Sequence, residues 1–142
     1  AHIAEVEVDL ETGLVDVVDY WAVHDVGRVI NPVFLEGQVH GGVSTGIGWA
    51  LTEDMLYDKK GNLLNPGFLD YRIPGPKDVP RIHTDFVETD DPSGPLGAKG
   101  IGEPAINPVA AAILNAIYDA IGVRFNSLPV TPERILEAIS RK

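Results

Sequence analysis

The residues best suited to chemistry lie in a glycine-rich loop, "GPLGAKGIGEP", which runs from Gly94 to Pro104 and leads to one acidic residue, Glu103. Glycine loses more backbone freedom on folding than any other residue, so this loop is costly to order. The helix predicted after the loop would favour the ionised carboxylate near its N-terminus. The sequence therefore predicts a proton acceptor at Glu103. A purely structural role as a helix cap stays open as the alternative.

The glycine spacing of this loop does not fit the common nucleotide-binding motifs. A P-loop requires G-x-x-x-x-G-K-[ST], whereas Lys99 is followed by Gly100. The order G-x-x-G-x-G is also the reverse of the dinucleotide fingerprint G-x-G-x-x-G. The loop offers instead a bare backbone that can approach a ligand closely.

A second candidate is the segment "VFLEGQVHGGVSTGIGWALTED", which has an apolar stripe at steps of four residues and reads as a helix. Each of its five glycines costs about 1 kcal/mol relative to Ala in a helix interior. Close approach by a flat, hydrogen-bonding ligand would explain them, and tight helix packing is the alternative. The nearly side-chain-free face predicted by helical spacing carries Gln38, Gly41, Gly42, Thr45, Gly46 and Trp49.

Other kinds of active site find little support. The chain has no cysteine, so it has no thiolate nucleophile, disulfide or iron–sulfur ligand. Its four histidines lie on different predicted elements without metal-ligand spacing, so no metal ligand is predicted. A G-x-S-x-G elbow is missing too, and this argues against a hydrolase.

Composition indicates one globular domain over residues 1–142. The chain is 44% hydrophobic and 23% charged, values typical of a globular protein. Its formal net charge of −10 repels a phosphate backbone, so nucleic acid is not expected as a partner. Apolar runs are shorter than a membrane span, and we expect a cytoplasmic protein with no membrane contact.

The predicted elements give an α+β fold, with a mixed sheet and hairpins packed against three helices. Strands come first and helices do not alternate strictly with them. We expect a hairpin over residues 1–25, a helix from Asn31-Pro32, a second hairpin around 57–62, an extended segment over 68–74, a strand over 81–89, and helices from Asn107-Pro108 to Gly122 and from Thr131-Pro132.

Five separated motifs then carry a family resemblance. They are "EGQVHGGVSTGIGWALTED", "DYRIP", "DVP", "GPLGAKGIGEPAINPVAAAILNAIYDAIGVR" and "PVTPERIL". Their order and spacing resemble the C-terminal part of the molybdopterin-binding large subunit of the xanthine dehydrogenase and aldehyde oxidase family, the molybdenum hydroxylases. The resemblance runs essentially end to end and implies that residues 1–142 are a C-terminal cofactor-binding subdomain of a larger subunit.

The resemblance implies roles for individual residues. Glu103 falls on the family's general base beside molybdenum, and Gln38 on a glutamine that hydrogen-bonds the pterin. Many relatives carry a second glutamine where this chain has Thr45, so one hydrogen bond to the cofactor would be made differently here. The cofactor-binding residues implied are Gln38, Gly41, Gly42, Thr45, Lys99, Gly100, Ile101 and Gly102.

Cofactors and partners are implied by the same resemblance. The complete enzyme would hold molybdopterin, in its plain or cytosine dinucleotide form, with iron–sulfur clusters and FAD on other domains or subunits. It would hydroxylate an aldehyde or N-heterocycle with water. The isolated chain would bind no cofactor and be inactive without the rest of its subunit. Two alternatives stay open: a non-catalytic assembly domain of the same fold, and a stand-alone pterin- or nucleotide-binding domain without redox chemistry.

Overall fold

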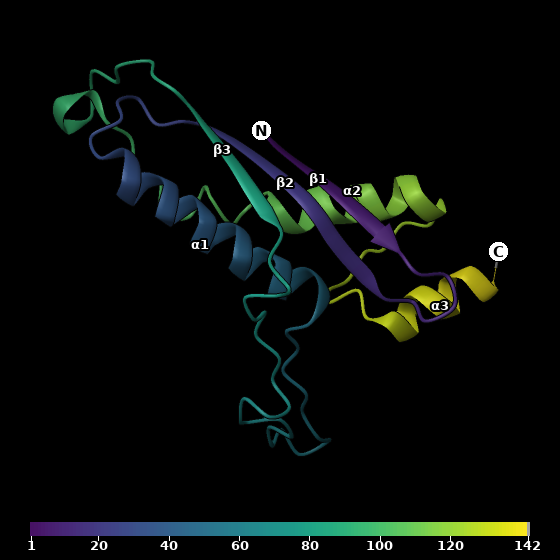
Figure 1. Cartoon of the computed structure of the whole chain (residues 1–142). Coiled ribbons are helices and arrows are strands. Elements are labelled where there is room, and N and C mark those ends of the chain that lie inside the picture. Colours follow the sequence, from purple (N-terminus) through teal and green to yellow (C-terminus); the bar gives the residue numbers. More distant parts are fainter. Residues whose placement is uncertain (142) are drawn as a thin grey trace.

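The computed structural model describes residues 1–141 and contains one mixed three-stranded sheet and three α-helices. Strands β1 (His2–Val8) and β2 (Val15–Asp25) form the predicted antiparallel hairpin. Strand β3 (Arg81–Val87) pairs in parallel with β2, so the strand order is β1-β2-β3 (Figure 1). The predicted α+β class is confirmed.

A register shift lets the hairpin keep one face apolar. Glu5 pairs with Asp19 and Val6 pairs with Val17, so Val18 has no partner residue on β1. Such a bulge reverses the alternation of side chains along a strand. Val17 and Tyr20, three residues apart, therefore both lie on the buried face.

Two helices cover this buried face. Helix α1 (Pro32–Leu51) begins as predicted, with the Asn31 side chain accepting a hydrogen bond from Phe34 N at 3.2 Å. Helix α2 (Val109–Ile121) ends as predicted at Gly122, whose φ of 69° is readily adopted by glycine. The predicted Asn107 cap of α2 is wrong, because Val109 N already donates to the Ile106 carbonyl in a run of turns.

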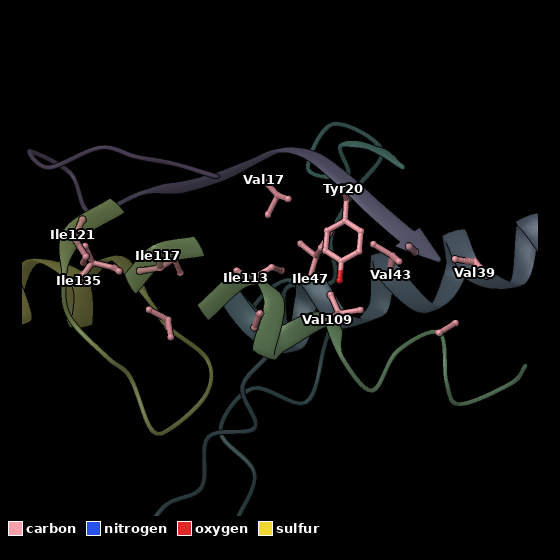
Figure 2. Close-up of a cluster of buried hydrophobic side chains, with 14 residues drawn as sticks. Val17, Tyr20, Val39, Val43, Ile47, Val109, Ile113, Ile117, Ile121 and Ile135 are labelled. Atoms are coloured by element: carbon pink, nitrogen blue, oxygen red, sulfur yellow. The ribbon is translucent and has the colours of Figure 1, made fainter. Parts of the chain in front are cut away.

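Branched aliphatic side chains from the two helices meet the sheet in one core. Figure 2 shows Tyr20 reaching from β2 toward Val109, at the start of α2. The shorter helix α3 (Pro132–Ser140) adds Ile135, which is fully buried, near the C-terminal end of α2. The core joins all three helices to the hairpin through Val17, Tyr20, Ala22, Val39, Val43, Ile47, Ala50, Ala105, Val109, Ile113, Ile117, Ile121, Val130 and Ile135.

Residues 52–80 form an arm that extends away from the sheet and helices (Figure 1). The hairpin predicted here is reduced to one bridge between Tyr57 and Leu63. The extended segment predicted over 68–74 is wrong at its start, because Asp70 N and Tyr71 N both donate to Gly67 O and close a turn. Phe68 and Leu69 are more than four-fifths exposed, at 84% and 89%.

No helix within residues 1–141 has the length and apolar character needed to cross a membrane.

A hydrogen-bonded histidine pair lies on the buried side of the hairpin. His2 Nδ1 is 2.8 Å from Tyr20 Oη, and His2 Nε2 is 2.8 Å from His24 Nε2. Burial, with a smaller contribution from His24 and the N-terminal charge, lowers the pKa of His2 from 6.5 to about 4. The pKa of His24 is also lowered, again mainly by burial. Both rings are therefore neutral in the folded chain at pH 7.

We expect these histidines to make the chain less stable as the pH falls. Between pH 6.5 and about 4 the unfolded chain binds a proton at His2 and the folded chain does not, so protonation favours unfolding. Urea unfolding should give a lower midpoint at pH 4.5 than at pH 7. The double variant His2→Phe/His24→Phe is the control, because it removes both titrating rings. If its urea midpoint fell between pH 7 and pH 4.5 as much as that of the parent chain, the two histidines would not be the cause.

Candidate functional site

Two positions of the glycine loop must be glycine, because a side chain there would collide with the loop or with a residue just before it. A Cβ at Gly97, where φ is +78°, would lie 2.1 Å from Asp90 Oδ1. A Cβ at Gly94 would lie 2.0 Å from the Ala98 carbonyl oxygen. Tight folding of the loop around the short 3-10 turn Pro95–Gly97 therefore explains these two positions.

Four other glycines face open space. A Cβ at Gly100 or Gly102 in the loop would meet no atom within 4 Å, and the same holds for Gly37 and Gly41 on α1. None of the four has a positive φ. Neither packing nor backbone conformation within residues 1–141 requires glycine at these positions.

Gln38 connects the two sets of open glycines. Its Nε2 donates to the Gly102 carbonyl oxygen at 3.4 Å, between the exposed face of α1 and the end of the loop. Beside this contact lies a pocket of about 400 Å³, lined by the N-terminal part of α1 and by loop residues. The pocket brings together Gln38, Lys99, Ile101 and Gly102 of the predicted cofactor-binding set, with Arg28 and Phe34 beside them.

Gly42 and Gly46 of α1 pack against α2 and the turn before it, whereas Gly48 packs against Glu53 and Pro74 of the arm. A Cβ at Gly42 would lie 2.6 Å from Ala105 Cβ, and a Cβ at Gly46 would lie 2.4 Å from Val109 Cβ. The predicted bare face is therefore too wide: Gly46 is buried, and packing explains it. Gly42 is half-buried with the same role, and a cofactor contact there stays a prediction.

Thr45 remains on the open face with Gly41. Its hydroxyl donates to the Gly41 carbonyl oxygen at 2.9 Å, within the helix itself. Both residues are exposed. The hydrogen-bonding capacity of Thr45 is thus partly used by its own helix, as is common for threonine in helices.

Glu103 lies between two fixed points. The preceding residue, Gly102, is held by Gln38, and Ala105 is fully buried against Gly42. Within residues 1–141 the exposed Glu103 carboxylate makes no hydrogen bond or ion pair, which leaves its oxygens available as acceptors. Its predicted place directly before a helix is wrong, because the turns at 102–108 separate it from α2 and the dipole effect fades within one turn.

One residue of this region was missed by the sequence analysis. Asp25, at the end of β2, accepts a hydrogen bond from Lys99 Nζ at 2.7 Å. The pKa of Asp25 is lowered to about 2, mainly by the hydrogen bond from Lys99 and then by those from Gly27 N and the Thr89 hydroxyl. Only its place immediately before a turn, in "HDVG", could have drawn attention to it.

The part of the chain that the structure describes contains no group of three or more His, Asp or Glu side chains arranged to hold a metal ion. The open surface offers backbone amides, one glutamine and one free carboxylate. These groups can hydrogen-bond an organic ligand and accept a proton.

Residues 1–80 match the family described as "Molybdopterin cofactor-binding domain". The chain belongs to the molybdopterin-binding subunits of the xanthine dehydrogenase and aldehyde oxidase family. It is 52% identical over 116 residues to a putative xanthine dehydrogenase molybdenum-binding subunit of Escherichia coli, covering 81% of the chain and 15% of that protein. It is 41% identical over 140 residues to the nicotine 6-hydroxylase large subunit of Paenarthrobacter nicotinovorans, covering 96% of the chain and 17% of that protein.

Solved structures agree with this assignment. The crystal structure of quinoline 2-oxidoreductase from Pseudomonas putida superposes with a TM-score of 0.94 at 40% identity, covering 99% of this chain and 18% of that protein. The chain therefore spans less than a fifth of the length of these relatives. The fold and the family recognised from the five motifs are both confirmed.

Substitution of an open glycine tests whether packing within this chain requires glycine there. Gly41→Ala should raise the free energy of unfolding by about 1 kcal/mol, because Ala favours helix and the added methyl meets no atom within 4 Å. Urea unfolding of the isolated chain measures this change. Gly46→Ala is the matched control: its methyl would press into Val109, and a gain in stability there as large as at Gly41 would contradict the packing described above.

Proposed function

We propose that the chain forms part of a molybdenum hydroxylase that uses water to hydroxylate an aldehyde or an N-heterocycle. In this proposal the chain contributes Glu103 as general base and part of the molybdopterin pocket, and it is inactive alone. The observation that supports it most directly is the group of four glycines facing open space around the contact between Gln38 and Gly102.

The residues present fit a pterin cofactor. A flat heterocycle rich in donors and acceptors needs close backbone approach and amide partners, and the open glycines with Gln38 offer both. The proposed cofactor contacts are Gln38, Gly41, Gly42, Thr45 and the backbone of residues 99–102. Bound molybdopterin would supply the redox centre at which the substrate is oxidised.

Glu103 would act by accepting a proton. Its carboxylate is exposed and unpaired within residues 1–141, while its backbone is held on both sides. A general base must be both ionised and fixed within hydrogen-bond reach of the group that it deprotonates. The contacts of Gly102 and Ala105 support the second requirement.

The remaining parts of the proposal concern the complete protein. Residues 1–142 would be one C-terminal domain of a large subunit, located in the cytoplasm. The rest of that subunit would complete the pocket, and iron–sulfur clusters and FAD would sit on other domains or subunits. The cofactor would be molybdopterin or its cytosine dinucleotide form. The relatives include a nicotine 6-hydroxylase large subunit and an aldehyde oxidoreductase molybdenum-binding subunit, and these names support a heterocyclic or aldehyde substrate.

The test is to purify the protein from its own source by a C-terminal tag and to measure molybdenum content and native mass. Stoichiometric molybdenum in an assembly larger than the 15.3 kDa chain is expected. A metal-free species of the chain's own mass would overturn the proposal and favour the assembly domain. Gly41→Ala, introduced into the same assembly, should lower molybdenum occupancy although it stabilises the chain, because its methyl would enter the proposed cofactor surface.

A further inference from the structure

Asp25 holds three separate segments of the chain at one carboxylate. Its Oδ1 accepts Gly27 N at 3.0 Å, in the turn after β2, and the Thr89 hydroxyl at 2.9 Å, after β3. Its Oδ2 accepts Lys99 Nζ at 2.7 Å, in the glycine loop. The pair Asp25–Lys99 thus joins the ends of two parallel strands to the loop that carries Glu103.

Backbone contacts at the same place show how closely these segments pack. Lys99 N donates to the Val26 carbonyl at 2.9 Å, so Lys99 is held by both its side chain and its backbone. A Cβ at Gly27, where φ is +67°, would lie 2.3 Å from the Gly97 carbonyl oxygen. The turn after β2 and the glycine loop are therefore in direct contact.

Downstream of Lys99 the loop has little to restrain it. Gly100 and Gly102 meet nothing within 4 Å at the Cβ position and are free to adopt many backbone conformations. The next fixed points are the Gln38 contact to Gly102 and the buried Ala105. The Gln38 contact to the Gly102 carbonyl is long, at 3.4 Å, and exposed, so an anchor upstream of the two glycines adds a second restraint on the position of Glu103.

We infer that Asp25 and Lys99 are positioning residues, which fix the upstream end of the glycine loop and thereby aim Glu103. An exposed ion pair alone contributes little to stability, and both side chains here are about a third exposed. The effect comes instead from the convergence of three segments on one carboxylate. The inference rests on the proposed function of Glu103 as base.

The experiment uses the complete enzyme and compares Asp25→Asn and Lys99→Met with Glu137→Gln. The last variant removes the carboxylate with which Glu137, on α3, pairs with Arg141 just after the helix, and it serves as the matched control. Hydrogen exchange of residues 97–103, molybdenum content, kcat and KM are measured for each. Thr89→Val, which removes only the hydroxyl donor to Asp25, is a milder variant in case Asp25→Asn does not assemble.

We expect faster exchange in residues 97–103 for Asp25→Asn and Lys99→Met, and kcat is expressed per bound molybdenum so that any loss of cofactor is separated from a loss of rate. Misplacing a catalytic group by a fraction of an ångström to an ångström costs rate, so kcat should fall by about tenfold or more with little change in KM. The double variant Asp25→Asn/Lys99→Met should lose no more kcat than the more impaired single variant, because both substitutions break the same Asp25–Lys99 ion pair. Lys99→Arg should keep most of the activity.

Exchange that matches the Glu137→Gln control, or losses in kcat that multiply in the double variant, would overturn the inference. If only Thr89→Val assembles, it should still show faster exchange over residues 97–103, and exchange equal to the control would likewise reject the inference. Full turnover in Glu103→Gln would instead reject the proposed base. The exchange measurement does not depend on turnover, so the two failures are distinguishable.

Discussion

Glu103→Gln in the assembled enzyme is expected to lower turnover by about 10²–10⁴-fold, the usual contribution of a positioned general base. Glutamine keeps the size and polarity of the side chain and removes its ability to take a proton. The exposed carboxylate has no hydrogen-bond or ion-pair partner within residues 1–141, so its replacement leaves no other group unpaired. Molybdenum content and native mass should therefore stay unchanged.

The loss of one negative charge must be separated from the loss of the base. Glu137→Gln, on α3, controls for the loss of one negative charge. Turnover of Glu103→Gln within a factor of two of that of the parent enzyme would assign Glu103 a structural role instead.

Gly46→Val is expected to destabilise the chain by about 3 kcal/mol, in the range for overpacking a well-filled core. Even the first added carbon would lie 2.4 Å from Val109 Cβ, and Val109 is fully buried and branched, so it has no room to turn away. Relief requires α1 and α2 to separate. Because α2 follows the turns that carry Glu103, such separation would also move the site.

Urea unfolding of Gly46→Val measures the loss, with Gly37→Val as the control. Gly37 is on the same helix, and its added Cβ would meet no atom within 4 Å. A β-branched side chain is accepted there with only the small change expected from helix propensity. Equal losses in both variants would show that valine in the helix, and not the contact with Val109, is responsible.

Local signals in the sequence were enough to predict the hairpin, the Asn31 cap and the Gly122 stop. Each of these depends on residues close in sequence, such as the Asn31 side chain and Phe34 N. The predicted Asn107 cap of α2 was wrong, because the chain forms a run of turns after Glu103. In these turns the Ile106 carbonyl accepts the hydrogen bond from Val109 N that the Asn107 side chain was expected to accept.

The division of roles among the glycines of α1 could not be predicted from the helix alone. Gly41 and Gly42 are neighbours in sequence, yet one faces open space and the other contacts Ala105. Only the position of a segment more than sixty residues later decides between them. The Asp25–Lys99 pair could not be predicted for the same reason, because its two residues are 74 positions apart in the sequence. The roles proposed for Gln38 and Glu103 came from the family resemblance and not from local patterns.

The parallel pairing of β2 with β3 has a consequence for how this chain tolerates changes in length. Residues 26–80, which include α1 and the arm, connect the two strands, so the pairing closes a long loop. The entropy of closing a flexible loop grows only slowly, by about 0.6 kcal/mol for each doubling of its length. Insertions or deletions within the arm should therefore change the stability of the sheet very little. A change in the arm's length should instead move the exposed Phe68 and Leu69 relative to the sheet and helices.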